Sequence, residues 1–269
     1  MMDARHNRPE TNGCSDCRDA PQRPGEALGY WECVEAMTIE TTLLSVLSDL
    51  EALAQCVLFF LGGQDSMSSV IAHTVYLLAL HQDVQAKLQE EIDHCFSLHG
   101  EDLAPDVVSR LGYLHAVVSE SLRLFPPATR IDRSPTEDYV LGNTGITVPK
   151  GCAIVVPLYA MHRDPIHFPD PDSFIPERFS ESNACSILPY TYLPFGAGPK
   201  ACMGINLALL AVKLCLMHSL RAVQFIRTSK TQVPLRFYNG FGLLHSKPFV
   251  VGVRDRSVLT HSAKTDSRN

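Results

Sequence analysis

The feature that most constrains this chain is a single cysteine in a glycine-rich loop. The loop covers residues 195–204, Phe-Gly-Ala-Gly-Pro-Lys-Ala-Cys-Met-Gly, and runs directly into an apolar helical pattern over residues 205–220. Backbone N–H groups of such a loop turn toward the sulfur of Cys202, and the positive end of the following helix adds to their effect. Both favour the thiolate, which is an electron-donating ligand for iron. The alternative is an inert, buried cysteine at the start of a helix.

The composition places the chain in a globular class. Its 269 residues, 45% of them hydrophobic and 19% charged, suffice for one large domain or two small ones with a sizeable core. The formal net charge of −6 argues against nucleic-acid binding, and so does the lack of a Lys- or Arg-rich run. The nine cysteines form no disulfide framework, and their odd number indicates a reducing compartment.

No segment has the sequence of a membrane anchor. Residues 1–30 are polar and lack the apolar core of a signal peptide or anchor. The longest uninterrupted apolar run, residues 56–63, is far too short to cross a bilayer. We therefore expect this chain to have no membrane anchor of its own.

Hydrophobic periodicity predicts a mainly α fold with small β-sheets, an α+β class. Apolar residues recur every three to four positions over residues 41–80, 83–96 and 113–125, which predicts three helices. Gly62 and Gly63 interrupt the first of these and predict a close approach or a local widening of the helix. Strand-like runs follow at residues 139–141, 146–148 and 153–156, and the tail over residues 223–253 is rich in strand signals.

Four motifs occur in order along the chain. They are Gly62-Gly63-Gln64-Asp65-Ser66, the pair Glu120 and Arg123, the run Phe174-Ile175-Pro176-Glu177-Arg178-Phe179, and the cysteine loop. In this company the cysteine loop resembles that of the cytochrome P450 haem-thiolate monooxygenases. Residues 113–118, 124–127, 189–192 and 231–235 are most similar to the drug-oxidising family-3 clan and its thromboxane synthase relatives.

The resemblance covers residues 47–256 and implies the C-terminal, haem-thiolate portion of the P450 fold. We divide the chain accordingly. Residues 1–40 are predicted to be a disordered or non-homologous leader, residues 41–256 the haem-binding portion, and residues 257–269 a polar tail. The haem-binding portion would contain the long central helix, the helix with Glu120, the P-E-R-F element, and the cysteine loop with its following helix.

For the cysteine loop, the resemblance implies a haem b whose iron is axially bound by Cys202. Phe195 would pack near the sulfur and shelter it. Gly198 and Gly204 would be further loop positions in contact with the cofactor.

Two basic residues would hold the haem carboxylates. Arg133 matches a contact of this kind in the family, and Lys200 stands where the family usually has Arg. A lysine offers a point charge instead of a bidentate fork, so we expect weaker anchoring of the haem.

Glu120 and Arg123 lie three residues apart, so their side chains meet on one face of a helix. Alone, this pair is a weak signal, because it is common on exposed helices. The resemblance adds Arg178, from the P-E-R-F element, as a second guanidinium beside the same carboxylate. We expect a largely buried cluster that supports the cysteine loop and takes no part in the chemistry. A solvated helix face is the alternative.

The resemblance assigns proton relay to Asp65 and Ser66. Gly62 and Gly63, just before them, would let O2 and substrate approach the haem. The family usually has Thr in place of Ser66, and serine lacks the β-methyl group that restricts χ1. We therefore expect a loosely aimed hydroxyl and more leakage of reduced oxygen. A polar interruption that caps a short helix is the alternative.

The implied function is that of a monooxygenase. It would take two electrons from a flavoprotein of the NADPH-cytochrome P450 reductase type, activate O2, and insert one oxygen atom into a small apolar substrate. A peroxide isomerase of the thromboxane synthase kind, which needs neither O2 nor a reductase, is one alternative. A catalytically inactive, truncated remnant that acts by association with another protein is the other.

Family members begin with a membrane anchor and a long first half that carries most of the substrate pocket. We therefore expect this chain to be a truncated form of such a protein. The intact parent would lie on the cytosolic face of the endoplasmic reticulum membrane, and membrane association would be confined to that parent. A chain without the anchor would be cytosolic.

Overall fold

The structure is a computed structural model that describes residues 47–240 and 243–256. The predicted leader (1–40) and polar tail (257–269) lie outside the described residues. The helices are α2 (Asp49–Leu80), α3 (Gln82–His99), α4 (Pro105–Ser109), α5 (Gly112–Leu124), α6 (Leu158–Met161) and α7 (Ile205–Ala222). Three short 3-10 helices follow or separate them, η2 (Pro176–Phe179), η3 (Ala184–Ser186) and η4 (Gly198–Lys200). The predicted fold class, mainly α with small β-sheets, is confirmed.

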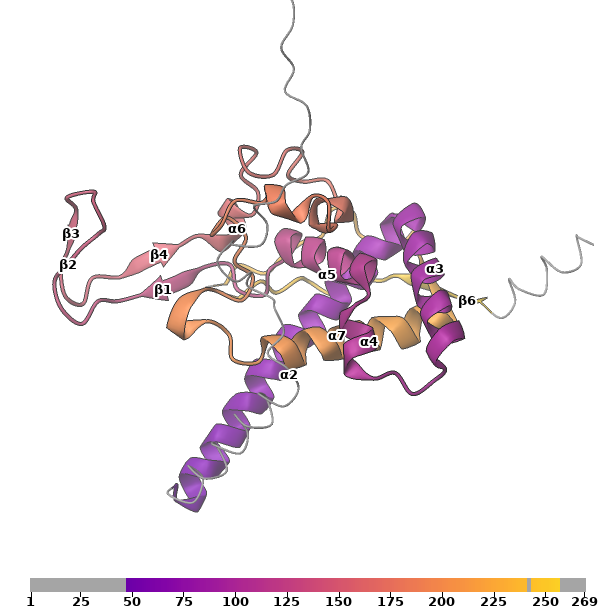
Figure 1. The fold of residues 1–269 in the computed structure, drawn as a ribbon, viewed down its shortest axis with the longest axis horizontal. Coiled ribbons are helices and arrows are strands. Elements are labelled where there is room, and N and C mark those ends of the chain that lie inside the picture. Colours follow the sequence, from indigo (N-terminus) through magenta and orange to yellow (C-terminus); the bar gives the residue numbers. More distant parts are fainter. Residues whose placement is uncertain (1–46, 241–242, 257–269) are drawn as a thin grey trace, which may run out of the picture.

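The long helix α2 begins at a well-formed N-terminal cap. The backbone N–H of Ser48 donates to the Glu51 carboxylate at 2.9 Å, and the Ser48 hydroxyl accepts from the Glu51 backbone N–H at 3.4 Å. This reciprocal capping box satisfies two donors that a helix start leaves open. It fixes the start of α2 at Asp49; the first part of α2 projects from the helical body, and its later part runs into it (Figure 1).

Three small antiparallel sheets accompany the helices. Strand β1 (Ile131–Arg133) pairs with β4 (Ile154–Val156), β2 (Tyr139–Val140) with β3 (Thr147–Val148), and β5 (Val223–Ile226) with β6 (Gly252–Asp255). The first two sheets form one long hairpin that projects from the helical body (Figure 1). The tail was predicted to be rich in strands, but its described residues between β5 and β6 make only isolated bridges. Pro234 and Pro248 interrupt it, because proline has no N–H for a ladder.

The core lies where the second half of α2 meets α3, α5 and α7. Leu78, Leu88, Leu114 and Leu216, one from each helix, are fully buried there. Helix α7 contacts α2, α3, α4 and α5, and α5 also contacts η2. The helix that follows the cysteine loop is thus the centre of the core, which gives the loop a rigid base.

Helix α7 is also long and apolar enough to cross a membrane by length and composition. The sequence had predicted no such segment, because Asn206 and Lys213 interrupt its apolar run. It contacts four other helices of the fold and 28% of the segment is buried, and length and composition alone are weak evidence for a membrane span.

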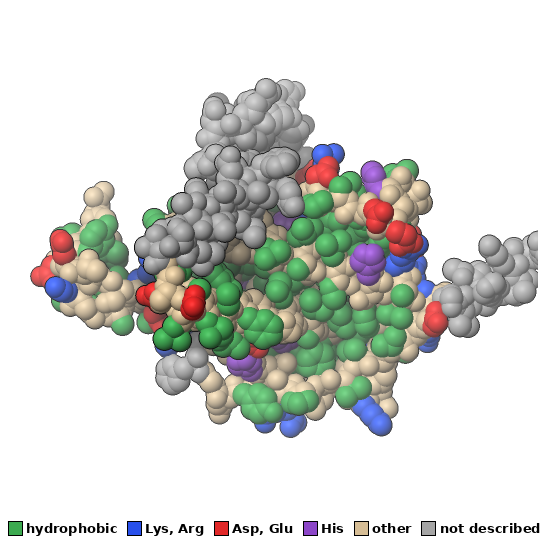
Figure 2. Space-filling view, turned by 90° about the horizontal axis from the view of Figure 1, so that it is seen from below, with side chains coloured by type: hydrophobic (Ala, Val, Ile, Leu, Met, Phe, Trp, Pro, Cys, Tyr) green, Lys and Arg blue, Asp and Glu red, His purple; other side chains and the backbone are tan. Residues whose placement is uncertain are grey.

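The first half of α2 is apolar and exposed on all sides. Leu50, Leu53, Val57, Leu58 and Phe60 project from different faces of it, and the exposed fractions of Leu50 and Phe60 are 76% and 68%. Hydrophobic side chains also cover much of the molecular face shown in Figure 2. A helix that is apolar all round is normally buried, and a large exposed apolar area favours association with other molecules.

We expect copies of the chain to associate through the exposed first half of α2, and charge placed on this helix should weaken that association. Replacing Phe59 and Phe60 together with Glu is expected to shift the chain toward the monomer in sedimentation velocity runs. Gln55→Glu adds a charge to the same helix without removing an apolar side chain, and it should leave the distribution of sedimentation coefficients nearly unchanged. An unchanged distribution in the double variant would show that α2 does not drive association.

Candidate functional site

One hollow in the described part of the chain combines apolar walls with a thiol and basic side chains. Its volume is about 460 Å³, and it lies between α2, α5, α7, β1 and the cysteine loop. Apolar side chains of the three helices form much of its lining, namely Met67 and Val70 of α2, Val118 and Leu122 of α5, and Ala208, Leu209 and Val212 of α7. The lining also includes a thiol, an aromatic ring and three cationic side chains, namely those of Cys202, Phe195, Lys200, Arg130 and Arg133.

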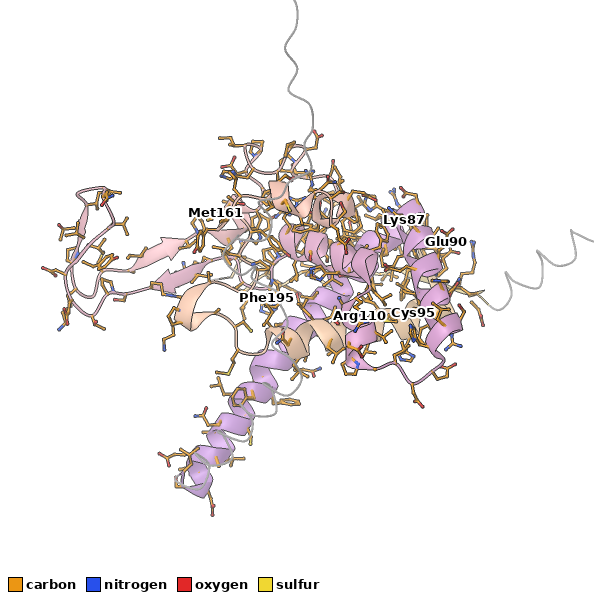
Figure 3. All side chains as sticks on the ribbon, in the orientation of Figure 1. Lys87, Glu90, Cys95, Arg110, Met161 and Phe195 are labelled. Atoms are coloured by element: carbon orange, nitrogen blue, oxygen red, sulfur yellow. The ribbon has the colours of Figure 1, made fainter. Side chains whose placement is uncertain are left out.

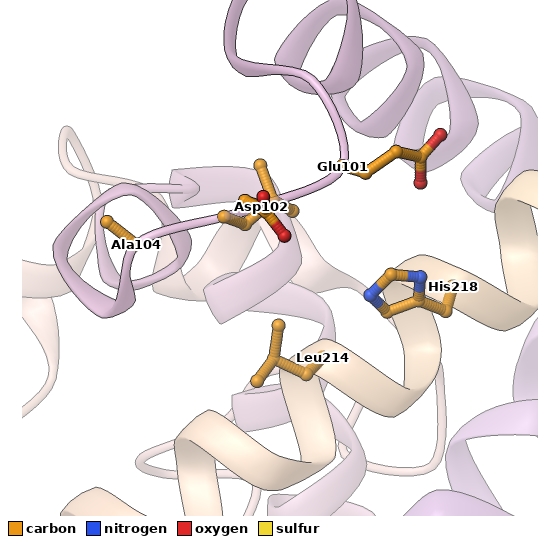
Figure 4. A pocket seen from close by; sticks show the side chains of 6 residues that line it. Glu101, Asp102, Ala104, Leu214 and His218 are labelled. Atoms are coloured by element: carbon orange, nitrogen blue, oxygen red, sulfur yellow. The ribbon is translucent and has the colours of Figure 1, made fainter.

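A second hollow of about 440 Å³ lies between the α3–α4 connection and α7 (Figure 4). It is lined by Glu101, Asp102 and His218 together with the apolar side chains of Leu103, Ala104 and Leu214. The Glu101 carboxylate already accepts a hydrogen bond of 2.6 Å from Arg221. Among the described residues no group of three or more His, Cys, Asp or Glu side chains could hold a metal ion. We therefore take the hollow at Cys202 as the candidate site.

The cysteine loop is shaped by its own backbone. The Cys202 N–H donates to the Phe195 carbonyl at 2.9 Å, and the Ala201 N–H donates to the Gly198 carbonyl at 2.9 Å. Gly196 and Gly198 have φ angles of +75° and +74°, in the left-handed region that favours glycine. At Gly196 a side chain would also press on Ile131 of β1, since its Cβ would lie 3.4 Å from the Ile131 Cδ1.

These constraints place Cys202 on the wall of the hollow. Its residue is exposed, and α7 begins three residues later, after Gly204. Phe195, labelled in Figure 3, lies near the base of the hairpin and also faces the hollow. Of the two predicted glycines, neither Gly198 nor Gly204 lines it. Gly198 instead sets the turn, and the Gly204 carbonyl accepts from the Ala208 N–H at 2.8 Å.

Three cations lie around the hollow. Lys200 and Arg133 both line it, and an Arg133 Nη2 donates to the Lys200 backbone carbonyl at 3.4 Å, which joins β1 to the loop. Arg130 lines it too, with its Nη2 3.2 Å from an Asp132 carboxylate oxygen. Arg130 was not predicted from the sequence as a residue of the site, although it lies only three residues before Arg133.

The Glu120 carboxylate is fully buried and surrounded by donors. Arg123 contacts both of its oxygens, at 2.7 and 2.8 Å, and the Ile175 backbone N–H donates to Oε1 at 3.0 Å. The Arg178 Nε lies 3.4 Å from the same Oε1. The three residues singled out in the sequence therefore lie together, and the alternative of a solvated helix face does not hold for Glu120 and Arg123.

Arg123 also ties α5 to a distant coil segment. Its remaining N–H groups donate to the carbonyls of His162, Pro171 and Ser173 at 2.8, 2.7 and 3.1 Å. The guanidinium is fully buried, so these bonds satisfy donors that would otherwise carry a large desolvation penalty. The cluster fixes the backbone that leads to η2.

The expected proton relay is not assembled in the structure. Ser66 lines the hollow, but its hydroxyl donates to the Gly62 carbonyl at 2.7 Å, as serine often does inside a helix. Asp65 does not line the hollow, and its carboxylate lies 3.8 Å from the His245 Nε2. Both residues are adjacent in sequence and point to different partners.

The prediction of a local widening at Gly62 and Gly63 is wrong, because α2 is a regular α-helix through both. Neither glycine lines the hollow. A side chain at Gly62 would meet nothing within 4 Å, and one at Gly63 would touch only the Met67 Cε at 3.6 Å. No described segment approaches these glycines, so their small size is not used by a close contact.

Two buried histidines, His73 and His162, and the partly buried His115 make the stability of the fold pH-dependent. Burial lowers the pKa of His73, His115 and His162 from the ordinary 6.5 to about 4, and the positive charges of Lys213 and Arg123 add to this effect at His115 and His162. The folded state thus prefers the neutral imidazoles, whereas the unfolded chain protonates near pH 6.5. The free energy of unfolding is therefore highest above pH 6.5, where these imidazoles are neutral in both states, and it falls as the pH drops toward 4.

We expect each histidine to account for on the order of 3 kcal/mol of this loss. Urea unfolding at pH 7, 6, 5 and 4 measures it. His73→Phe keeps the ring that stacks on Phe125, with centroids 4.9 Å apart, but removes one titrating group. Its free energy of unfolding should fall less steeply with decreasing pH, and equal slopes for both proteins would contradict the assignment.

The fold and the hollow together define a class of protein, in which a mainly helical body presents one thiol to an apolar cavity bordered by cations. Comparison with known proteins identifies the family. A profile of the cytochrome P450 family matches residues 32–253. The chain belongs to the cytochrome P450 family.

The chain is similar to several mammalian P450 proteins. It is 41% identical over 217 residues to cytochrome P450 3A2 of Rattus norvegicus, and 42% identical over 220 residues to cytochrome P450 3A7 of Homo sapiens. Both matches cover 81% of this chain and 42% of the relative. The chain thus spans less than half the length of the curated relatives it matches.

The residues around the hollow fit a haem. A haem is a flat, largely apolar ring with two carboxylates and an iron that accepts a thiolate. The apolar side chains of α2, α5 and α7 suit the ring, the cations Lys200, Arg130 and Arg133 suit the carboxylates, and Cys202 offers sulfur from the same cavity.

Proposed function

We propose that this chain is the haem-thiolate portion of a monooxygenase. The observation that carries the proposal is a hollow that combines Cys202, three cations and an apolar lining. Family membership supports a haem monooxygenase in general. The intact enzyme would consume O2, two electrons and two protons, insert one oxygen atom into a C–H bond of a small apolar substrate, and release the other as water.

In this proposal Cys202 would bind the iron of a haem b through its sulfur. Phe195 shelters the sulfur, and Gly198 and Gly204 set the loop and the start of α7. Lys200 and Arg133 hold the haem carboxylates, with Arg130 as a third cation. When bound, the haem supplies the iron at which O2 is activated. Glu120, Arg123 and Arg178 keep the loop in place and touch no reacting atom.

Proton delivery would fall to Ser66, with Asp65 behind it. For this role the Ser66 hydroxyl must rotate about χ1 away from the Gly62 carbonyl and into the hollow. Serine can do so because it lacks the β-methyl group that would restrict χ1. Asp65 must likewise leave His245. We propose that this rearrangement accompanies ligand binding.

The electrons would come from a flavoprotein of the NADPH-cytochrome P450 reductase type. The family relatives support a redox partner and O2 in general. We propose the cytosolic face of the endoplasmic reticulum membrane as the location of the intact protein.

Titration of the full chain with haemin tests the cofactor assignment. Absorbance changes should saturate near one haemin per chain. Arg133→Met and Lys200→Met, which keep much of the side-chain stem, should weaken binding severalfold each. Arg110→Met removes an exposed arginine away from the hollow and should bind like the unsubstituted chain. Equal affinity in all four proteins would overturn the proposed carboxylate contacts.

A peroxide isomerase is the second candidate, and the geometry of α2 favours it. Such a reaction moves oxygen atoms within one molecule, needs no proton delivery, and is compatible with Asp65 and Ser66 in their observed positions. Ser66→Ala separates the two. A monooxygenase should lose product per electron consumed and leak more hydrogen peroxide, whereas an isomerase should turn over an organic peroxide at an unchanged rate.

A further inference from the structure

His162 lies between the buried Glu120–Arg123 cluster and the chain that enters the cysteine loop. It directly follows α6 and is fully buried. Its backbone carbonyl accepts a hydrogen bond of 2.8 Å from Arg123. Its side chain points to a different part of the molecule, so this one residue joins α5 to a second segment.

That second segment is the approach to the cysteine loop. The Leu193 backbone N–H donates to the His162 Nε2 at 2.9 Å. The next turn is built on the same residue, because the Leu193 carbonyl accepts from the Gly196 N–H at 3.1 Å. The loop then closes through the bond from the Cys202 N–H to the Phe195 carbonyl. Three successive hydrogen bonds thus lead from His162 to Cys202, the first to the His162 side chain and the other two between backbone groups.

The hydrogen bond from Leu193 also fixes the chemical form of His162. A nitrogen that accepts from an N–H carries no proton, so the proton of the neutral ring is on Nδ1. Among the described residues the Nδ1 has no hydrogen-bond partner, although it is buried. A buried donor without a partner destabilises the fold. The ring nevertheless keeps this orientation, and the hydrogen bond that it gains there is the one that Nε2 accepts from Leu193.

Tyr192 completes the anchor on the other side. Its hydroxyl donates to the Ser119 carbonyl of α5 at 2.9 Å. Its ring lies 5.3 Å from the His162 ring and 4.7 Å from the ring of Phe179, the last residue of η2. The residue just before Leu193 is therefore packed between α5, η2 and His162, and Leu193 cannot shift without disturbing this contact.

We propose that His162 is a positioning residue for the cysteine loop. Its neutral imidazole holds the Leu193 backbone through Nε2, and Leu193 in turn sets the turn from which Cys202 is presented to the hollow. This inference rests on the proposed function, because the loop matters through Cys202. It concerns only residues of this chain and can be tested without haem.

Hydrogen exchange of backbone amides in the full 269-residue chain tests it. His162→Leu keeps the approximate volume but removes the acceptor, and the amides of Gly196 and Cys202 should exchange roughly tenfold to a hundredfold faster. The core amides of Leu88 and Leu216 report global unfolding and should change far less. His162→Gln places an amide oxygen near the position of Nε2, and it should restore most of the protection.

Faster exchange that is equal at Gly196, Cys202 and the core amides would overturn the inference, since it would show only a loss of global stability. So would a glutamine variant no better than leucine. The unsubstituted chain offers a test that needs no variant. In native-state exchange at rising urea, the amides of Leu193, Gly196 and Cys202 should open as one unit, and a separate opening of Leu193 would contradict the anchor.

These outcomes are distinct from failure of the proposed function. If Cys202 does not bind haem iron, the carbon monoxide difference spectrum of the reduced, haem-loaded chain will lack a thiolate-type band while the exchange pattern stays as described. If His162 does not hold the loop, the amides of Gly196 and Cys202 in His162→Leu will show no extra exchange beyond that of the core amides, while Cys202 can still bind the iron.

Discussion

Replacing Glu120 with Gln should lower the free energy of unfolding by about 3–5 kcal/mol, because it leaves buried guanidinium charge without a counter-ion. The carboxylate is fully buried and contacts Arg123 at 2.7 and 2.8 Å and Arg178 at 3.4 Å. Glutamine has nearly the same shape but no charge, and its NH2 group would face the donors of Arg123. Urea unfolding followed by circular dichroism measures the loss.

An exposed ion pair in the same protein provides the control. Arg110 and Asp106 lie 3.1 Å apart in α4 and its C-terminal cap, and both side chains are largely in solvent. Asp106→Asn should cost less than about 1 kcal/mol, as exposed pairs usually do. A loss at Glu120 as small as that at Asp106 would show that the cluster does not hold the fold.

Truncating Leu216 to Ala should cost about 2–5 kcal/mol, because the cavity it leaves lies in the middle of the core. Leu216 is on α7, the helix that contacts α2, α3, α4 and α5, and its side chain is fully buried. The same unfolding measurement reports the loss. The change should also weaken the base on which the cysteine loop rests.

Leu207 is the matched control, since it is the same residue type on the same helix but 68% exposed. Leu207→Ala should change the free energy of unfolding by no more than about 0.5 kcal/mol. Equal costs at the two positions would mean that helix propensity, and not core packing, sets the stability of α7.

The helices that the sequence predicts best are those with a long amphipathic pattern. The patterns over residues 83–96 and 113–125 correspond closely to α3 (Gln82–His99) and α5 (Gly112–Leu124). Helix α4 was missed because five residues are too few to show a period. Strand β1 has little strand pattern of its own, because its run, Ile131 to Arg133, is polar at two of three positions, and it is held as a strand by pairing with β4.

Site residues were predictable where a motif fixed their partners. Glu120 and Arg123 are one helical turn apart, so their contact follows from helix geometry. The orientation of Ser66 was not predictable in this way, because its hydroxyl has a competing acceptor in its own helix, the Gly62 carbonyl. The partner of the His162 side chain was not predictable either, since Leu193 is 31 residues away and is reached only through the fold.

The most direct test of the site is the carbon monoxide difference spectrum of the reduced, haem-loaded full chain, recorded beside Cys202→Ser and Cys185→Ser. Cys185 is also exposed, but it does not line the hollow. We predict a red-shifted, thiolate-type Soret band in the unsubstituted chain and in Cys185→Ser, and its loss in Cys202→Ser. The same band in Cys202→Ser, or no such band in any of the three proteins, would contradict Cys202 as the haem ligand of this chain.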